Sequence, residues 1–223
     1  MSIDDITLSI ILVAYTILMV FVTKYLYHYL INKGTTANDS LYYTRKFVHI
    51  LAGGVVTLFI PFYSTPLIPL LAGILLTLIT LFTHTQGDKL YWFQTDKNYN
   101  DVSFCFMWGI SIFALWTLLG YQQRWIAIIP AAYMAFGDGV TGIVRNKLYN
   151  HRSKHPLGNL FMALVCIPIG YVYAGLAALS LPGVISAITA SIIERFEFGP
   201  IDDNILITVS SALILYLSSI LML

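Results

Sequence analysis

An aspartate stands at the end of a long apolar stretch, within Gly137-Asp-Gly-Val-Thr-Gly142. On a helix, Asp138, Thr141 and Arg145 share one face, at spacings of three and seven residues. An ionisable residue at the edge of an apolar span is a functional candidate, because charge is costly there. The three glycines leave room for a ligand, or for another helix, to approach the backbone. Since Mg²⁺ is usually held by one or two carboxylates together with substrate phosphates, Asp138 is a candidate metal ligand; the alternative is a solvated aspartate in a helix-end turn.

A basic cluster with a histidine, Arg45-Lys-Phe-Val-His49, opens an earlier apolar run. Arg45 and His49 are four residues apart and share a helix face. The functional interpretation is a set of cations directed at phosphate oxygens, with His49 placed slightly deeper. The alternative is a charged anchor at the membrane boundary with an incidental histidine.

Residues 145–158 carry a second basic cluster, which includes Arg145, Lys147 and Lys154. Lys154 is the preferred phosphate contact, because the Pro-Leu-Gly turn that follows it can offer backbone N–H groups. The alternative is a loop that lies near anionic lipid headgroups, which attract any Lys or Arg.

An acidic cluster lies near the end of the chain, between two apolar runs. It contains Glu194, Glu197, Asp202 and Asp203, with Asn204 directly after them. These oxygens can hold a metal ion or position a hydroxyl group. Alternatively, Asn204 caps the last helix and the aspartates are solvated.

These four stretches together supply the kinds of side chain that phosphoryl or nucleotidyl transfer needs. Cations neutralise a polyphosphate, carboxylates hold Mg²⁺, and a further group orients or deprotonates the attacking hydroxyl. The chain has neither a Gly-x-x-x-x-Gly-Lys-Ser/Thr motif nor a protein-kinase signature, so a nucleotide site must be of another kind.

Composition indicates a membrane protein. The 223 residues are 58% hydrophobic and 10% charged, with a mean hydropathy of +0.77, whereas a soluble domain carries roughly 25% charged residues. Apolar runs of the length that crosses a bilayer as helix recur along the whole chain. The net charge of +1 does not suggest a nucleic-acid partner. Cys105 and Cys166 lie inside apolar runs and are expected to be core residues rather than metal ligands or a disulfide.

The expected fold is an all-α, polytopic membrane helix bundle that forms a single transmembrane domain over residues 1–223. We predict eight spans, near residues 6–31, 47–63, 66–84, 102–120, 125–144, 158–178, 181–194 and 204–222. The seventh follows a Ser-Leu-Pro-Gly turn and is short, so seven spans are the alternative.

Positive charge is strongly asymmetric across these spans. Eleven of the twelve Lys and Arg residues fall in or beside alternate connections, and only Arg124 lies on the other side. The positive-inside bias places those connections, and with them the polar clusters, in the cytoplasm. Eight spans then put both termini outside, in the cell membrane or, for a eukaryotic chain, the endoplasmic reticulum membrane.

The order of these motifs resembles the dolichol kinase and phytol kinase family, which is similar to phosphatidate cytidylyltransferases. The resemblance covers about residues 42–210 and includes Arg45 to His49, Gly137 to Gly142, Lys154 with Gly158, and the acidic cluster up to Asn204. It implies a membrane-embedded enzyme that phosphorylates a lipid alcohol, with CTP as the usual donor and Mg²⁺ as cofactor. The chain departs from the family pattern at Thr141 and Asn159, where we expect a small residue and a Ser or Thr.

The resulting prediction is a Mg²⁺-dependent kinase that transfers the γ-phosphate of CTP, or alternatively ATP, to an isoprenoid alcohol of the dolichol, polyprenol, geranylgeraniol or phytol type. The alternatives are a cytidylyltransferase that forms a CDP-lipid and, less favoured, a small transporter. A homodimer is compatible with the apolar surface.

The expected catalytic residues are Asp138, His49 and Lys154. The expected metal ligands are Asp138, Glu194, Asp202 and Asp203. The expected nucleotide-binding residues are Arg45, Lys46, Gly137, Gly139, Gly142, Arg145, Lys147, Lys154 and Asn204.

Overall fold

The structure is a computed structural model that describes residues 4–86, 89–95, 98–149 and 155–221. All regular structure in these ranges is helical, apart from one isolated bridge between Phe198 and Ile201. The longer elements, in chain order, are α1 (Asp5–Asn32), α2 (Ala37–Val48), η1 (His49–Gly54), α3 (Val55–Phe59), α4 (Leu67–Gln86), α5 (Asn100–Leu119), α6 (Arg124–Ala127), α7 (Ile129–Ala132), η4 (Tyr133–Gly137), α8 (Asp138–Tyr149), α9 (Pro156–Gly175), α10 (Ser180–Ile193) and α11 (Asp203–Leu221).

These elements combine into eight passages along the bundle, as the hydropathy pattern predicts. The second passage runs without a break from α2 to Phe62, and the fifth from Tyr121 to the end of α8. Seven of the eight passages are long and apolar enough to cross a membrane. The remaining one, α10, is the seventh in chain order and has only 14 residues. The all-α polytopic bundle is thereby confirmed, and its apolar helices are compatible with a multi-pass membrane protein.

The helix that contains the second predicted span begins at Ala37, ten residues before the predicted span boundary at 47. Thr36 caps this helix, because its side chain accepts a hydrogen bond from the Asp39 backbone N–H and donates one to the Asp39 carboxylate. The first turns are polar, so a hydropathy window does not detect them. As a result, Arg45 and Lys46 lie within a continuous helix rather than in a connection.

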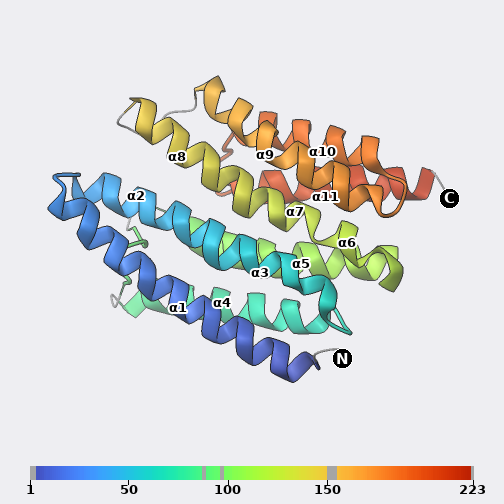
Figure 1. The fold of residues 1–223 in the computed structure, drawn as a ribbon, viewed down its shortest axis with the longest axis horizontal. Helices are drawn as coiled ribbons and strands as arrows, with labels where there is room; N and C mark the ends of the chain where they lie inside the picture. Colours follow the sequence, from blue (N-terminus) through green and yellow to red (C-terminus); the bar gives the residue numbers. More distant parts are fainter. Residues whose placement is uncertain (1–3, 87–88, 96–97, 150–154, 222–223) are drawn as a thin grey trace.

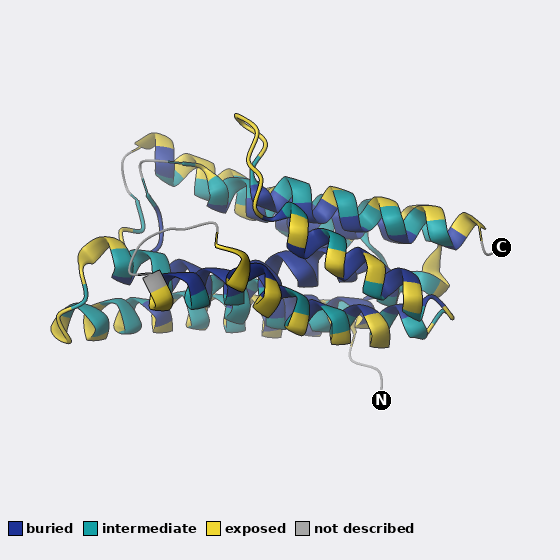
Figure 2. Cartoon of the chain, turned by 90° about the horizontal axis from the view of Figure 1, so that it is seen from above, coloured by how far each residue is buried: buried dark blue, intermediate teal, exposed yellow. Residues whose placement is uncertain are grey.

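The passages are arranged so that both chain termini lie at one end of the bundle (Figure 1). Helices α1 and α4 form one side, α9, α10 and α11 form the other, and α5 with the fifth passage lies between them. The fifth passage is the centre of the core, since 83% of its most apolar stretch is buried. Exposed residues face outward along the other helices (Figure 2), including many large apolar side chains such as Leu71, Leu164 and Leu213. Lipid is the solvent that suits such a surface.

Helices α9 and α10 pack closely where two glycines meet. A Cβ atom on Gly183 would overlap the backbone carbonyl of Gly170 and would lie 2.8 Å from the Cβ of Ala174. The hydroxyl of Tyr133 donates a hydrogen bond to the Gly183 carbonyl at 2.8 Å, which ties η4 to the same contact. Small residues of this kind allow helix backbones to approach within a membrane.

We predict that Gly183→Ala destabilises the bundle by about 1–3 kcal/mol, because the added methyl group meets backbone that cannot rotate away. The midpoint of thermal unfolding in detergent, followed by circular dichroism, measures this. Ile188→Ala on the same helix is the matched control, since its side chain is exposed and lipid or detergent replaces its contacts. Equal midpoints for the two variants would contradict the assigned packing role.

Candidate functional site

Two π-helical segments lie side by side at the candidate site. η1 begins at His49, and η4 ends immediately before Asp138. A Cβ atom on Gly53 of η1 would lie 3.7 Å from the Cβ of Ala135 in η4. π-Helical turns add a residue to the helix and occur frequently at functional sites. Here the side chains of His49, at the start of η1, and Asp138, directly after η4, lie close together.

Lys46 and Asp138 form a buried ion pair between α2 and α8. The Lys46 Nζ atom lies 2.6 Å from both carboxylate oxygens of Asp138. The Nδ1 atom of His49 lies 3.3 Å from Asp138 Oδ2 but is not aligned for a hydrogen bond with it. The His49 ring stacks on Phe104, with ring centroids 4.1 Å apart. One basic cluster and the Gly-Asp motif, predicted separately, therefore form a single unit.

The glycines beside Asp138 make this pair possible. A Cβ atom on Gly142 would overlap the Lys46 side chain, and one on Gly139 would lie 2.5 Å from Ile50 Cγ1. A Cβ atom on Gly137 would lie 2.6 Å from the sulfur of Cys166, which is a buried core residue as expected. Close approach of another helix is one of the two uses expected for these glycines. Their contact with a nucleotide stays a prediction.

A second buried ion pair joins α8 to α10. Arg145 Nη1 donates to Glu194 Oε1 at 2.8 Å, and Arg145 Nη2 donates to Asn159 Oδ1 at 2.9 Å. Asn159 in turn donates to Glu194 Oε2 at 3.2 Å and to the Ser191 carbonyl. The Arg145 Nε–H donates to the His155 carbonyl at 3.1 Å, in a space that a Cβ atom on Gly158 would fill. Asn159, a departure from the family pattern, thus bridges two residues that were both predicted for the site.

Three of the four predicted metal ligands come together. Asp138, Glu194 and Asp203, from three different passages, each place a carboxylate oxygen within 4.8 Å of the other two. Their exposed fractions are 2%, 2% and 6%. The two cations Lys46 and Arg145 are paired with Asp138 and Glu194 of this cluster. Hard carboxylate oxygens gathered in this way match the ligand preference of Mg²⁺.

Asp202, the fourth predicted ligand, lies outside this acid cluster (Asp138, Glu194 and Asp203). Its carboxylate accepts hydrogen bonds from Ser103, from Asn204 Nδ2 at 3.3 Å and from the Ile205 backbone N–H at 3.2 Å. Burial raises the pKa of the Asp202 carboxyl above its ordinary value, and the hydrogen bonds from Ser103 and Ile205 oppose that shift. Asp202 is therefore held by hydrogen bonds next to Asp203 and is not a member of the acid cluster.

Asn204 carries a buried polar atom without a partner. Its Nδ2 group donates to the Asn100 carbonyl at 2.9 Å and to Ser103 Oγ at 3.0 Å. Its Oδ1 atom is buried and has no hydrogen-bond partner among the described residues. A buried acceptor without a donor costs free energy. An approaching cation or ligand donor would remove that cost, and the amide adjoins Asp203.

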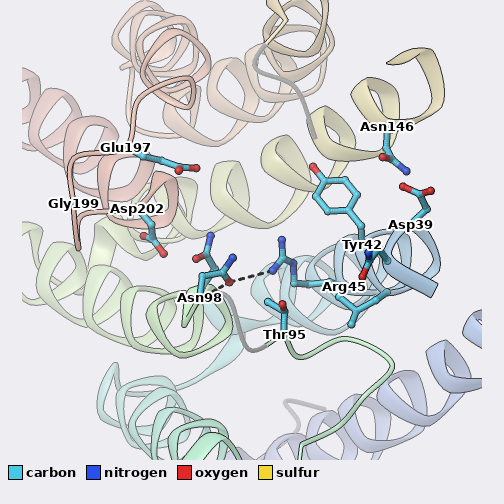
Figure 3. A pocket seen from close by; sticks show the side chains of 12 residues that line it. Asp39, Tyr42, Arg45, Thr95, Asn98, Asn146, Glu197, Gly199 and Asp202 are labelled. Atoms are coloured by element: carbon cyan, nitrogen blue, oxygen red, sulfur yellow. Dashed lines mark hydrogen bonds between the residues drawn. The ribbon is translucent and has the colours of Figure 1, made fainter. Parts of the chain in front are cut away.

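A polar cavity of about 450 Å³ is lined in part by Asp202, the sequence neighbour of Asp203, whereas none of the three acid-cluster residues lines it. Figure 3 shows Tyr42 and Arg45 from α2, Asn98 in the connection before α5, and Glu197 and Asp202 from the connection between α10 and α11. Arg45 Nη1 donates to Asn98 Oδ1 at 3.3 Å. Small-molecule sites have volumes of about 300–1,000 Å³, so a ligand of nucleotide size is compatible with this space.

Tyr42 lines the cavity and lies close to Arg45 and Lys46. The Lys46 Nζ atom and the Arg45 guanidinium carbon each lie 5.6 Å from the Tyr42 ring centroid. Both cations of the Arg45–His49 motif are therefore near the cavity wall. Lys147 is exposed at the end of α8, one residue after the cavity-lining Asn146. Lys154 lies outside the described residues, so its predicted role stays a prediction.

Several site residues were missed at the sequence level because they are neutral. They are Tyr42, Asn98, Asn100, Ser103 and Asn146. Asn98, Asn100 and Asn146 each adjoin a charged residue in the sequence, and such amides are the one signal that points to the site. Tyr42 and Ser103 have no charged neighbour in the sequence. Charge and glycine patterns, which guided the prediction, give no weight to neutral side chains.

Comparison of the chain with protein-family models, with curated proteins and with solved structures gives no significant match. The resemblance to the dolichol kinase and phytol kinase family thus stays a prediction.

We predict strong coupling between Lys46 and Asp138 in a double-mutant cycle of unfolding free energies. Lys46→Met and Asp138→Asn each remove one partner of a buried pair, which costs about 3–5 kcal/mol where the other charge stays unpaired. The double variant should lose less unfolding free energy than the sum of the two single-variant losses, by about 0.5–3 kcal/mol. Arg124→Ala combined with Asp138→Asn is the control. Arg124 lies at the other end of the bundle, so the effects of these two substitutions on the unfolding free energy should be additive. Additive losses for Lys46 and Asp138 would refute the coupling.

Proposed function

We propose that the chain is a membrane-embedded kinase that transfers the γ-phosphoryl group of CTP to the hydroxyl of an isoprenoid alcohol, with Mg²⁺ as cofactor. The observation that carries this proposal is the buried cluster of Asp138, Glu194 and Asp203, together with a polar cavity of about 450 Å³ whose wall includes the neighbouring Asp202. Carboxylates buried from three passages are costly to retain unless they serve a ligand. The choice of CTP, rather than ATP, rests on the family resemblance.

The acid cluster fits Mg²⁺ by the chemistry of its donors. Asp138, Glu194 and Asp203 would hold the ion, and Asn204, next to Asp203 in the chain, has a buried Oδ1 atom without a hydrogen-bond partner among the described residues. When bound, Mg²⁺ neutralises negative charge on the β- and γ-phosphates of the donor. Phosphoryl transfer depends mostly on such electrostatic stabilisation and on positioning, which suits a site with few reactive groups.

The cations of α2 and α8 suit the polyphosphate. Arg45 lines the cavity, and its guanidinium group presents several donors in a planar fork that matches phosphate oxygens. Lys46 is held by Asp138 at 2.6 Å. Once a cation binds the Asp138 carboxylate, the Lys46 ammonium becomes available to a phosphate oxygen. The buried pair therefore keeps both groups ready for Mg²⁺ and nucleotide.

In the proposed reaction, the hydroxyl oxygen of the alcohol attacks the γ-phosphorus. An oxygen–phosphorus bond forms, the bond from that phosphorus to the β–γ bridging oxygen breaks, and CDP leaves. The hydroxyl proton passes to a base, for which His49 and a carboxylate of the cluster are the candidates. His49 is 4% exposed and lies 3.3 Å from Asp138 through Nδ1, a position from which it can accept a proton.

The acceptor is proposed to be a lipid alcohol because the site lies within a bundle whose outer surface is apolar. A long isoprenoid chain can remain among the lipids while its hydroxyl reaches the site end of the bundle, defined as the end that carries the acid cluster and the cavity. The positive-inside bias supports placing this end in the cytoplasm, where CTP is available.

The direct test is an assay of purified protein with CTP labelled in the γ-phosphate, Mg²⁺ and a polyprenol. We expect labelled polyprenyl phosphate and free CDP, and loss of product when Mg²⁺ is chelated. Asp138→Asn and Asp203→Asn should each lower the rate by about 10²-fold or more, because each removes stabilisation of transition-state charge.

Arg124→Ala is the matched control and should keep the full rate, since this cation lies at the opposite end of the bundle. Absence of labelled lipid phosphate with either CTP or ATP would refute the kinase proposal. Pyrophosphate release from CTP with a lipid phosphate as acceptor would instead identify a cytidylyltransferase. A normal rate in Asp138→Asn would overturn the role of the acid cluster.

A further inference from the structure

The connection between α10 and α11 carries an exposed aromatic loop, which we define as residues 195–201. All seven of its residues are exposed. Phe196, Phe198 and Ile201 have exposed fractions of 47%, 61% and 41%. Three large apolar side chains within seven exposed residues are unfavourable in water, so the surroundings of this loop need an explanation.

The aromatic loop has a defined conformation. The backbone N–H of Phe198 donates to the Ile201 carbonyl at 2.9 Å, and that of Ile201 donates to the Phe198 carbonyl at 3.1 Å. Gly199 turns the chain between them with a φ of +60°, in the region that favours glycine. The rings of Phe196 and Phe198 stack in parallel, with centroids 6.1 Å apart and an interplanar angle of 2°. The two rings form one apolar face.

The other face of the aromatic loop lines the polar cavity. Glu197 and Gly199 belong to the cavity wall (Figure 3). Phe196 and Phe198, which alternate with them in the sequence, are not among the residues that line it. The loop is thus a thin partition with a polar inner face and an aromatic outer face.

The position of the aromatic loop places that outer face at the boundary of the bilayer. Helix α11 has 19 residues and starts at Asp203, so it spans about 28 Å. This length is close to the ~30 Å of membrane hydrocarbon, which puts Asp203 at the hydrocarbon edge. In Figure 2 the exposed connection projects sideways from the bundle rather than along its axis. Its side chains therefore extend along the lipid interface.

We propose that the aromatic loop anchors the cavity wall in the membrane, with Phe196 and Phe198 inserted among the lipids at the interface of the site end. Aromatic side chains are favoured in this zone of a bilayer. Arg195, exposed at the start of the loop, adds a positive charge at the level of the headgroups. This placement rests on the fold and holds independently of the reaction proposed for the site.

The test is a depth measurement on the full chain in phosphatidylcholine–phosphatidylglycerol vesicles. A nitroxide is attached to Phe198→Cys, and its collisions with oxygen, which concentrates in lipid, and with a water-soluble nickel chelate are compared by electron paramagnetic resonance. Leu213→Cys, 54% exposed on α11, serves as the lipid reference, and Lys33→Cys, exposed after α1, serves as the water reference. The labelled parent chain gives the background from Cys105 and Cys166.

We expect the label at position 198 to collide several-fold more with oxygen, relative to the nickel chelate, than the label at position 33. Glu197→Cys is the matched neighbour and should resemble the water reference more closely, because it faces the cavity. Phe196→Cys replaces Phe198→Cys if the latter does not fold. A water-like label at both aromatic positions would overturn the proposal. Protection from both reagents would also overturn it, since the loop would then be covered by protein, such as a second copy of the chain.

Discussion

The buried ion pair of Lys46 and Asp138 is the interaction on which the rest of the site depends. A charged carboxylate buried in an apolar bundle is costly without a partner cation, and the cation that pairs with Asp138 comes from a residue 92 positions earlier in the chain. The contact requires α2 to extend as a continuous helix beyond the apolar core, and it requires glycine at position 142 of α8. One electrostatic constraint thus determines the packing of two passages.

The pair of Arg145 and Glu194 applies the same constraint on the other side of α8. Through Asn159 it joins α8, α9 and α10, and the carboxylate of Glu194 reaches the acid cluster that includes Asp203 of α11. The two pairs tie together passages from both sides of the bundle. The cluster that they flank gathers three carboxylates, which are the hard oxygen ligands that a divalent cation such as Mg²⁺ prefers.

Much of this architecture is predictable from the sequence. Apolar run length gives the eight passages, and the Gly-Asp motif together with the acidic residues near 194–204 gives the members of the cluster. The start of α2 is not predictable from hydropathy, because its first turns are polar and depend on the Thr36 cap. The pairing of Lys46 with Asp138 is also not encoded in local spacing, since only the tertiary fold brings these residues together. Asn159 was noticed only as a departure from a family pattern, and its bridging role depends on that same fold.

The most direct measurement of the central claim is the number of Mn²⁺ ions bound per chain, with Mn²⁺ in place of Mg²⁺ and a non-hydrolysable CTP analogue present. Electron paramagnetic resonance of the free ion gives this number. The account predicts a bound ion in the parent chain and in Asp4→Asn, whose carboxylate caps α1 at the opposite end. It predicts loss of that ion in Asp138→Asn and in Asp203→Asn. Binding that is unchanged in the two cluster variants would contradict the account.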